Sequence, residues 1–595
     1  MEVCSRDHLA PLDPWARLAL SMIPRGNLRP PVTLLCRFAP LAAIPLAALL
    51  LATPAHAAKP APDVPAVDTF IGNYLAGRQA QRDGNLTAAA AYFGKALKQK
   101  PETPGLLRQT FIVTLIDGRM AEAVTLAKAY LKEEPDQAIA QLTVAVDHMK
   151  HKRFQQAEKM LKGLREEGLS TFTTPLLLTW ARFGQNAGAK ALDGLAPLAD
   201  KKGVENLVEI HQALIHQLTG NEDEAIKLLT GVVERQSPPS SRVVHILGAM
   251  LERKGEAEKA KAVYRLYLNE HPTSRLMDVA LKRAGGGKKP AIVIQTARDG
   301  AAEALYDIGS SLRRQNAQET AIALIRLALY LKPDFAVARF VLADILQSDN
   351  RLEAAVKEYE AVAPDSDYGW SAQMQAAALL GDLKRTDEAV KRLKALAKAR
   401  PDLPDPHLNL GDVFRRKEDY PKAAEAYSAA IKMVAKPEPH HWSLYYARGI
   451  AYERSKKWDK SEQDLLKALE LRPDQPYVLN YLGYTWIDQG QNLDKATEMI
   501  KKAVSLAPND GFIADSLGWA YYRLGDFAKA VVELERAVEL RPQDAVINDH
   551  LGDAYWQVGR KLEARFQWKR ALSLKPEQDL IPKIRRKLDK GLEPS

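Results

Sequence analysis

Alanine recurs along this chain at intervals of 34 residues, and this period constrains the fold more than any other feature of the sequence. A repeated unit of this length is typical of a helix–turn–helix, and arrays of such units form helical solenoids. A small residue early in the second helix allows the two helices of a unit to cross closely. The sequence therefore predicts an all-α chain of stacked helix pairs. The period is strict in two groups: Ala89, Ala123, Ala157, Ala191 and Ala225, and then Ala321, Ala355, Ala389 and Ala423.

The best-preserved unit, residues 511–544, shows the rest of the repeated pattern. It carries Leu517, Gly518, Tyr521, Ala530, Leu534, Ala537 and Pro542, and the next unit carries Leu551, Gly552, Tyr555, Ala564, Trp568, Ala571 and Pro576. This pattern resembles the tetratricopeptide repeat (TPR). The resemblance implies an α-solenoid that winds as a right-handed superhelix. It also implies a non-enzymatic scaffold that binds proteins or peptides in a concave groove.

This register gives about 14 units in two blocks, an N-terminal solenoid at 70–274 and a C-terminal solenoid at 302–578. Residues 275–301 separate the blocks, and Gly285, Gly286 and Gly287 predict a hinge there. These glycines lack the Gly-Lys-Ser/Thr order of a phosphate-binding loop, so we favour the hinge. Residues 579–595 are expected to form a capping helix and tail. The units begin at Phe70, Pro104, Ala138, Phe172, Asn206, Ser241, Ala302, Ala336, Trp370, Pro404, Trp442, Pro476, Gly511 and Ala545.

The first 57 residues have the layout of a secretory signal peptide. Arginines precede an apolar run from Phe38 to Ala52, and Ala55-His56-Ala57 supplies the small residues of a cleavage site. Met22 is an alternative start, and an uncleaved anchor is the less favoured alternative because prolines interrupt the short run. Residues 58–69 are expected to be a flexible lead-in. We therefore expect a periplasmic protein, whose mature chain lacks the sequence's two cysteines, Cys4 and Cys36.

Charge and motifs argue against several classes of protein. The 84 basic and 74 acidic residues are interspersed along the chain, which is typical of solvated helix surfaces, so we expect no nucleic-acid partner. No hydrolase, zinc-protease or kinase motif is present, and the repeats leave no room for an enzyme domain. The neighbouring histidines at 148 and 151, and at 440 and 441, lack a third metal ligand. We expect neither an enzyme nor a cofactor or metal.

The candidate partner site is a stripe on the first helix of each of the last four units. Positions 2, 5, 9 and 12 of a unit line the concave groove in the TPR family. Aromatic rings beside Asn and Asp are suited to holding the backbone of an extended peptide. The alternative is that these aromatics only fill space between helices. The stripe residues are Tyr446, Tyr477, Asn480, Tyr484, Phe512, Asp515, Trp519, Tyr522, Asp549, Asp553 and Trp556.

A closer resemblance covers residues 442–578. The runs 478–486, 515–525 and 550–556 are similar to bacterial periplasmic TPR adaptor lipoproteins that present substrates to a carboxyl-terminal processing protease. The resemblance implies a periplasmic protease and its substrates as partners. No cysteine ends the apolar run here, so membrane association is expected only through partners or an uncleaved signal. The alternative role is a structural subunit of an envelope assembly, secretion, pilus or polysaccharide-export machine.

We predict that the mature protein begins at or near Ala58, because Ala55-His56-Ala57 is the cleavage site that the sequence offers. N-terminal sequencing of the protein recovered from the periplasm checks this. An intact end at Met1 or Met22 on a cytoplasmic protein would contradict it.

Overall fold

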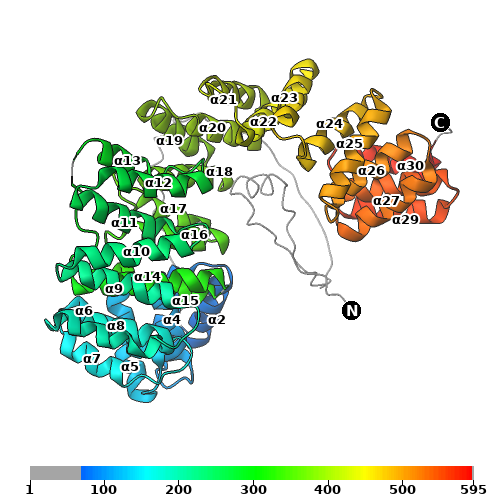
Figure 1. Cartoon of the computed structure of the whole chain (residues 1–595). Coiled ribbons are helices and arrows are strands. Elements are labelled where there is room, and N and C mark those ends of the chain that lie inside the picture. Colours follow the sequence, from blue (N-terminus) through cyan, green and yellow to red (C-terminus); the bar gives the residue numbers. More distant parts are fainter. Residues whose placement is uncertain (1–68, 288, 316, 593–595) are drawn as a thin grey trace, which may run out of the picture. The chain divides into compact units, whose positions relative to one another are not determined.

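The computed structural model describes residues 69–287, 289–315 and 317–592 (Figure 1). All regular elements in these ranges are helices, and none is a strand. The predicted signal peptide and nearly all of the predicted lead-in lie outside the described residues. In the part of the chain that is described, every helix is too short or too polar to cross a bilayer.

The described helices pair into fourteen helix–turn–helix units, as the alanine period predicts. In the first block the pairs are α2 (Phe70–Arg82) with α3 (Leu86–Gln99), α4 (Leu106–Asp117) with α5 (Met120–Glu133), α6 (Ala138–Lys150) with α7 (Phe154–Lys162), α8 (Ser170–Gly184) with η1 (Gly188–Leu198), α9 (Glu205–Leu218) with α10 (Glu222–Arg235), and α11 (Ser241–Lys254) with α12 (Ala257–Glu270). The element η1 is a 3₁₀ helix, in the unit whose sequence departs furthest from the pattern.

The second block continues the same pairing. Its pairs are α14 (Ala297–Arg314) with α15 (Gln318–Leu331), α16 (Ala336–Ser348) with α17 (Leu352–Glu360), α18 (Gly369–Asp382) with α19 (Thr386–Ala399), α20 (Asp405–Arg416) with α21 (Tyr420–Lys432), α22 (Trp442–Arg454) with α23 (Trp458–Leu471), α24 (Pro476–Asp488) with α25 (Leu493–Leu506), α26 (Gly511–Arg523) with α27 (Phe527–Leu540), and α28 (Ala545–Gln557) with α29 (Lys561–Ser573). Three short elements stand outside the pairs: α13 (Asp278–Gly285), the 3₁₀ helix η2 (Pro439–His441) and α30 (Leu580–Lys590).

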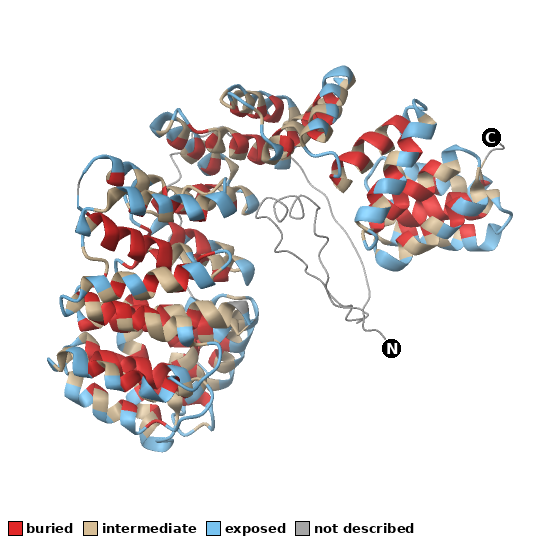
Figure 2. Ribbon diagram, in the orientation of Figure 1, coloured by how far each residue is buried: buried red, intermediate tan, exposed pale blue. Residues whose placement is uncertain are grey.

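Small residues hold the two helices of each unit together. Every alanine of the 34-residue series is fully buried, and so are Ala530 and Ala564 in the last two units. On the facing helix Gly518 leaves no room for a side chain, because a Cβ there would lie 2.5 Å from Cγ of Leu534. Buried residues accordingly follow the inward sides of the helices, whereas the turns are exposed (Figure 2). Burial of these facing sides is the main stabilising contribution of a repeat array.

Residues in the turns set where one helix ends and the next begins. Gly525 takes a left-handed conformation between α26 and α27, with φ at 80°, which glycine adopts without steric cost. Asp526 then caps α27 by accepting a hydrogen bond from the backbone nitrogen of Lys529. Asp544 caps α28 in the same way, at 2.9 Å from the nitrogen of Val546. These caps set where each helix begins.

The described helices form two compact units, residues 63–401 and 402–595. Their boundary lies at Pro401, and the division into two repeat blocks at 275–301 stays a prediction. Within the N-terminal unit the chain packs on itself over long separations, with α14 against α8 and α15 against α4 and α6. Nε of Arg326 donates to the carbonyl of Ile116 at 3.2 Å, and the hydroxyl of Tyr330 donates to Asp147 at 3.0 Å.

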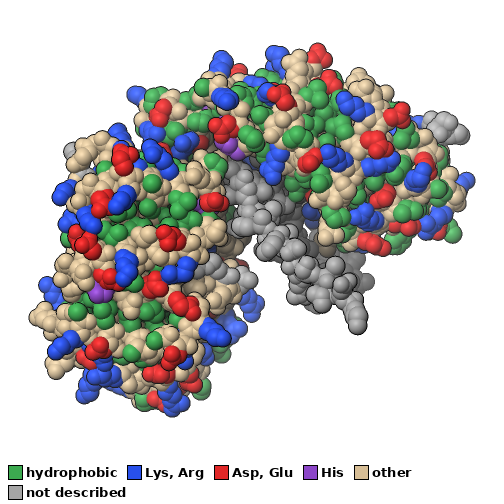
Figure 3. Space-filling model, in the orientation of Figure 1, with side chains coloured by type: hydrophobic (Ala, Val, Ile, Leu, Met, Phe, Trp, Pro, Cys, Tyr) green, Lys and Arg blue, Asp and Glu red, His purple; other side chains and the backbone are tan. Residues whose placement is uncertain are grey.

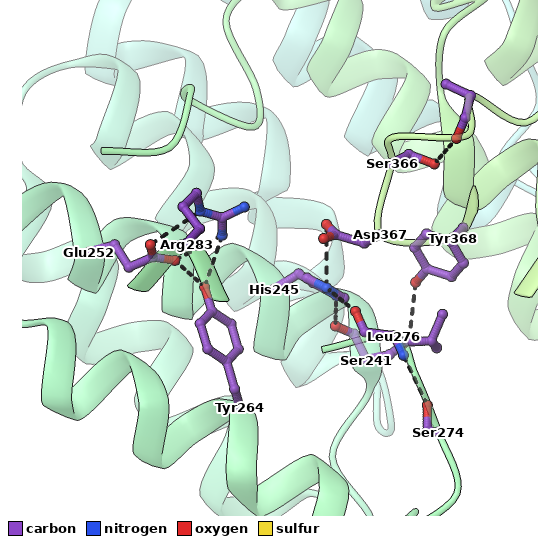
Figure 4. A network of polar contacts seen from close by, with 11 residues as sticks. Ser241, His245, Glu252, Tyr264, Ser274, Leu276, Arg283, Ser366, Asp367 and Tyr368 are labelled. Carbon is purple, nitrogen blue, oxygen red and sulfur yellow. Dashed lines mark hydrogen bonds and ion pairs between the residues drawn. The ribbon is translucent and has the colours of Figure 1, made fainter. Parts of the chain in front are cut away.

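Polar contacts hold the segment after α12 within the same unit (Figure 4). The two ring nitrogens of His245 in α11 lie 2.9 Å from the carbonyl of Ser241 and 3.0 Å from that of Leu276. Its Nε2 is also 3.4 Å from the carboxylate of Asp367, which precedes α18. Leu276 and the segment before α18 are thus joined through one buried side chain. Bending at the glycines of 285–287 stays a prediction.

Charged side chains of both signs are scattered over the face that Figure 3 shows. This agrees with the interspersed charges of the sequence. The i,i+3 pairs Lys467–Glu470 and Lys501–Glu498 are examples at the surface of the C-terminal unit. Such exposed pairs stabilise a helix only slightly.

We predict that Ala530→Leu or Ala564→Leu lowers the free energy of unfolding by about 1–3 kcal/mol, because either side chain overpacks a close helix crossing. Ala528→Leu in α27 is the matched control, since Ala528 is exposed on the same helix. Hydrogen exchange should show lost protection in the altered repeat and its neighbour before distant repeats. Equal loss along the whole chain, or equal effects of the Ala528 and Ala530 variants, would contradict this packing.

Candidate functional site

The predicted stripe lies on α22, α24, α26 and α28 of the C-terminal unit, and its members differ in burial. The three carboxylates at 515, 549 and 553 are buried. The remaining eight residues, Tyr446, Tyr477, Asn480, Tyr484, Phe512, Trp519, Tyr522 and Trp556, are half-buried. The stripe therefore divides into groups engaged within the chain and groups that remain accessible.

A stack of three rings occupies the middle of the stripe. The indole of Trp519 lies parallel to Tyr522 at 4.8 Å and to the imidazole of His550 at 4.1 Å between ring centroids. Nδ1 of His550 is 2.9 Å from Oδ1 of Asp515. Burial alone would lower the pKa of His550, but the carboxylates of Asp515 and its neighbours in α28 outweigh burial and raise this pKa. Asp515 is thus paired inside the chain.

The two carboxylates of α28 are held by the last helix. Nζ of Lys587 in α30 donates to Asp549 at 2.8 Å and to Asp553 at 2.7 Å. The other oxygen of Asp553 accepts from Nε1 of Trp568 at 2.9 Å. Burial raises the pKa of Asp553 to about 6, and Lys587 opposes that rise. Both oxygens of Asp553 are therefore engaged within the chain.

The end of α30 also covers Trp556. A Cβ at Gly591 would lie 2.1 Å from Cζ2 of Trp556, so the backbone of Gly591 rests on the indole. Trp556 also contacts Trp568, at 5.3 Å between ring centroids. In this way α30 takes the place of the first helix of a following repeat and packs against α29.

Three buried polar atoms of the stripe have no hydrogen-bond partner among the described residues. One is Oδ1 of Asp549, whose other oxygen accepts from Lys587. The other two are Oδ1 of Asn480 in α24 and Nε1 of Trp519 in α26, and these two helices pack against each other. Asn480 occupies the repeat position of Asp515, and Ser516 occupies that of His550. Because Ser516 donates to the carbonyl of Phe512 at 3.0 Å, the pairing that satisfies Asp515 is missing at Asn480.

The sequence analysis did not single out His550 or Lys587. It also did not predict that acidic residues such as Asp412 and Asp553 accept hydrogen bonds from large side chains of the second helix. The hydroxyl of Tyr427 donates to Asp412 at 2.8 Å, as Trp568 does to Asp553. The sequence does mark these acidic residues, because each directly follows a glycine that makes room for the large ring of the second helix. These glycines are Gly411 and Gly552.

The histidine pairs noted in the sequence are not among the stripe residues. Nδ1 of His151 is 2.8 Å from the carbonyl of Asp147, and the rings of His440 and His441 lie 3.9 Å apart. Across residues 69–287, 289–315 and 317–592, no three or more His, Cys, Asp or Glu residues are grouped to hold a metal ion.

Comparison with known proteins addresses the nature of the repeats. A "Tetratricopeptide repeat" family model matches residues 374–438 and 408–476, and another matches 302–335. A "TPR repeat" model matches residues 518–559. These segments are tetratricopeptide repeats. No enzyme family is among these models.

The chain is also similar to individual proteins. The TPR repeat-containing protein PA4667 of Pseudomonas aeruginosa is 26% identical over 439 residues, which cover 71% of each chain. A Giardia intestinalis UDP-N-acetylglucosamine–peptide N-acetylglucosaminyltransferase is 30% identical over 95 residues, which are 16% of this chain and 6% of that enzyme. The solved structure of the APC/C hetero-tetramer Cut9–Hcn1 is 14% identical, with coverage of 88% and 97% and a TM-score of 0.38.

We predict that the TPR units around His550 lose stability as the pH rises above about 6.5. The pKa of His550 is raised in the folded chain, so its contribution is complete below the unfolded pKa and is lost as the pH rises through the folded pKa. The loss of folding free energy amounts to about 1.4 kcal/mol for each pH unit that separates the folded and unfolded pKa values of His550. Hydrogen exchange of α26 and α28, corrected for intrinsic rates, measures it.

His550→Phe is the control, because it keeps a ring against Trp519 and removes the titration. Asp553, with a pKa of about 6, titrates mostly below this window. An unchanged pH dependence in the His550→Phe variant would contradict the assignment.

Proposed function

We propose that this protein is a non-enzymatic scaffold of the bacterial cell envelope that holds an extended segment of a partner protein along α22, α24 and α26. The observation that carries the proposal is the pair of unsatisfied atoms, Oδ1 of Asn480 and Nε1 of Trp519. One accepts and the other donates a hydrogen bond, which is the complement of a peptide unit. A buried polar group without a partner costs about 1–3 kcal/mol, so a bound backbone that satisfies both is favoured.

The rings around these atoms support the same role. Tyr484 and Tyr477 lie half-buried on α24, and Phe512 on α26 holds the guanidinium of Arg541 over its ring at 4.2 Å. Aromatic side chains give broad contact area with little loss of conformational entropy, and they dominate many peptide-binding surfaces. Four other stripe residues have a structural role in this proposal, because their contacts lie within the chain and hold the stripe and its cap in place. These residues are Asp515, Asp549, Asp553 and Trp556.

The proposed location is the periplasm, on the strength of the signal-like residues 1–57. The proposed partners are a carboxyl-terminal processing protease and its substrates, supported by the similarity of residues 442–578 to periplasmic adaptors. A structural subunit of an envelope assembly is the competing role. Capture of the tagged chain from the periplasm distinguishes the two roles. Recovery of a protease with its substrates supports the adaptor role, whereas recovery of a set of assembly subunits supports the structural role.

We predict that Trp519→Ala weakens the binding of a captured partner by about 2 kcal/mol, roughly thirtyfold in affinity. Asn480→Ala should weaken it by about 1 kcal/mol, because one hydrogen bond to the backbone is lost. Isothermal titration of the full chain with peptides of that partner measures both. Circular dichroism should be unchanged.

The matched control is Phe566→Ala, which removes an exposed ring of α29 in the same unit. Its affinity for the peptide should equal that of the unaltered chain. If Trp519→Ala instead leaves affinity unchanged and melts the last repeats, the stripe aromatics only fill space between helices.

A further inference from the structure

A second surface of the C-terminal unit exposes large apolar side chains. Leu562 and Phe566 stand four residues apart on α29, with 82% and 64% of their surfaces exposed. Residues at this spacing share one side of a helix. They protrude into solvent, and this exposed pair has no part in the proposed stripe on the first helices.

Positive charge surrounds this pair. Lys569 and Arg570 follow Phe566 by three and four residues, and both are exposed. Residues 558–592 contain eleven Lys or Arg and four Asp or Glu, a net charge of +7, whereas the whole chain has +10. Much of the excess positive charge is therefore gathered in the last repeat and α30.

Exposed basic residues continue onto α30. Lys583, Arg585 and Lys590 are exposed, whereas Lys587 is turned inward to the carboxylates of α28. The inward side of α30 is fixed by Ile584, which is fully buried against the core of the last two repeats. The outward side of the cap is thus free to carry cations without disturbing the packing.

We infer that the outward side of α29 and α30 docks on an anionic phospholipid bilayer. An apolar pair flanked by Lys and Arg is the pattern of helices that lie in a membrane interface, with apolar side chains among the acyl chains and cations at the headgroups. Protruding side chains suit a fluid surface, which closes around them without a preformed pocket. The excess of exposed Lys and Arg over Asp and Glu favours anionic over neutral lipid. This contact is a property of the folded repeats, and it goes beyond the membrane association expected from the sequence.

The preceding repeat provides an internal comparison. Val532 of α27 stands at the repeat position of Phe566 and is equally exposed, at 64%. Glu535 occupies the position of Lys569 there, and α27 carries three Glu against one Lys and one Arg. Arg536 stands at the position of Arg570, but the acidic residues of α27 outnumber its basic ones, so exposure of Val532 should not suffice to bind anionic lipid.

Co-sedimentation of the full chain with vesicles tests the inference. We expect binding to vesicles of phosphatidylcholine with phosphatidylglycerol, weakened by salt, and much less binding to phosphatidylcholine alone. The double variant Leu562→Ser, Phe566→Ser should lower partition into the anionic vesicles about tenfold or more. Lys569→Glu should also lower it. Val532→Ser and Trp519→Ala should leave it unchanged, which separates this surface from the peptide stripe.

Photocrosslinking distinguishes binding through this surface from binding through the apolar run at 38–52. A photoreactive benzoylphenylalanine in place of Phe566 should crosslink to lipid in anionic vesicles, whereas the same residue in place of Val532 should not. Crosslinking at neither position, or equally at both, would overturn the inference. So would a concentration-dependent dimer in light scattering that the double variant abolishes, because the surface would then bind a second copy of the chain.

Discussion

The close crossing of two helices at a small residue is the contact on which the rest of this structure depends. Ala530 and Ala564 are fully buried at such crossings, and Gly518 and Gly552 face large side chains from the opposite helix. A larger residue at any of these places would separate the helices. Because each pair covers only part of its own apolar surface, the next pair must stack on it. The repeated spacing of small residues therefore fixes both the unit and the array.

The fold could be predicted from the sequence where its contacts are local. Unit starts such as Trp442, Pro476, Gly511 and Ala545 are also the first residues of the observed helices, because the residues that set them lie within one repeat. The packing of α15 on α4 and α6 could not be predicted in this way. Arg326 and Ile116 are 210 residues apart, and such a contact leaves no periodic signal. The compact N-terminal unit consequently extends past the glycine-rich segment.

The repeat register of the stripe residues could be predicted from the sequence, but their hydrogen bonding could not. The register places Asp515 and Asn480 at equivalent points, and the sequence alone treats both as anchors for a partner. Their difference arises from the following helix, which offers His550 to Asp515 but only Ser516 to Asn480. Similarly, Lys587 donates to one oxygen of Asp549 and one of Asp553 only because α30 packs where a further repeat would begin. The side chains of neighbouring helices therefore determine which polar groups of the stripe lack a hydrogen-bond partner.

Departures from the repeat are therefore the places where this array can acquire a function. A residue that repeats is usually needed for packing, so a change at that position alters the surface only if the packing survives. Serine in place of histidine at 516 leaves Oδ1 of Asn480 without a hydrogen-bond partner among the described residues. Lys569 in place of Glu535 reverses the charge beside an apolar residue that both repeats expose. In both cases the helices keep their crossing, and the altered side chains are presented by a fold that does not depend on them.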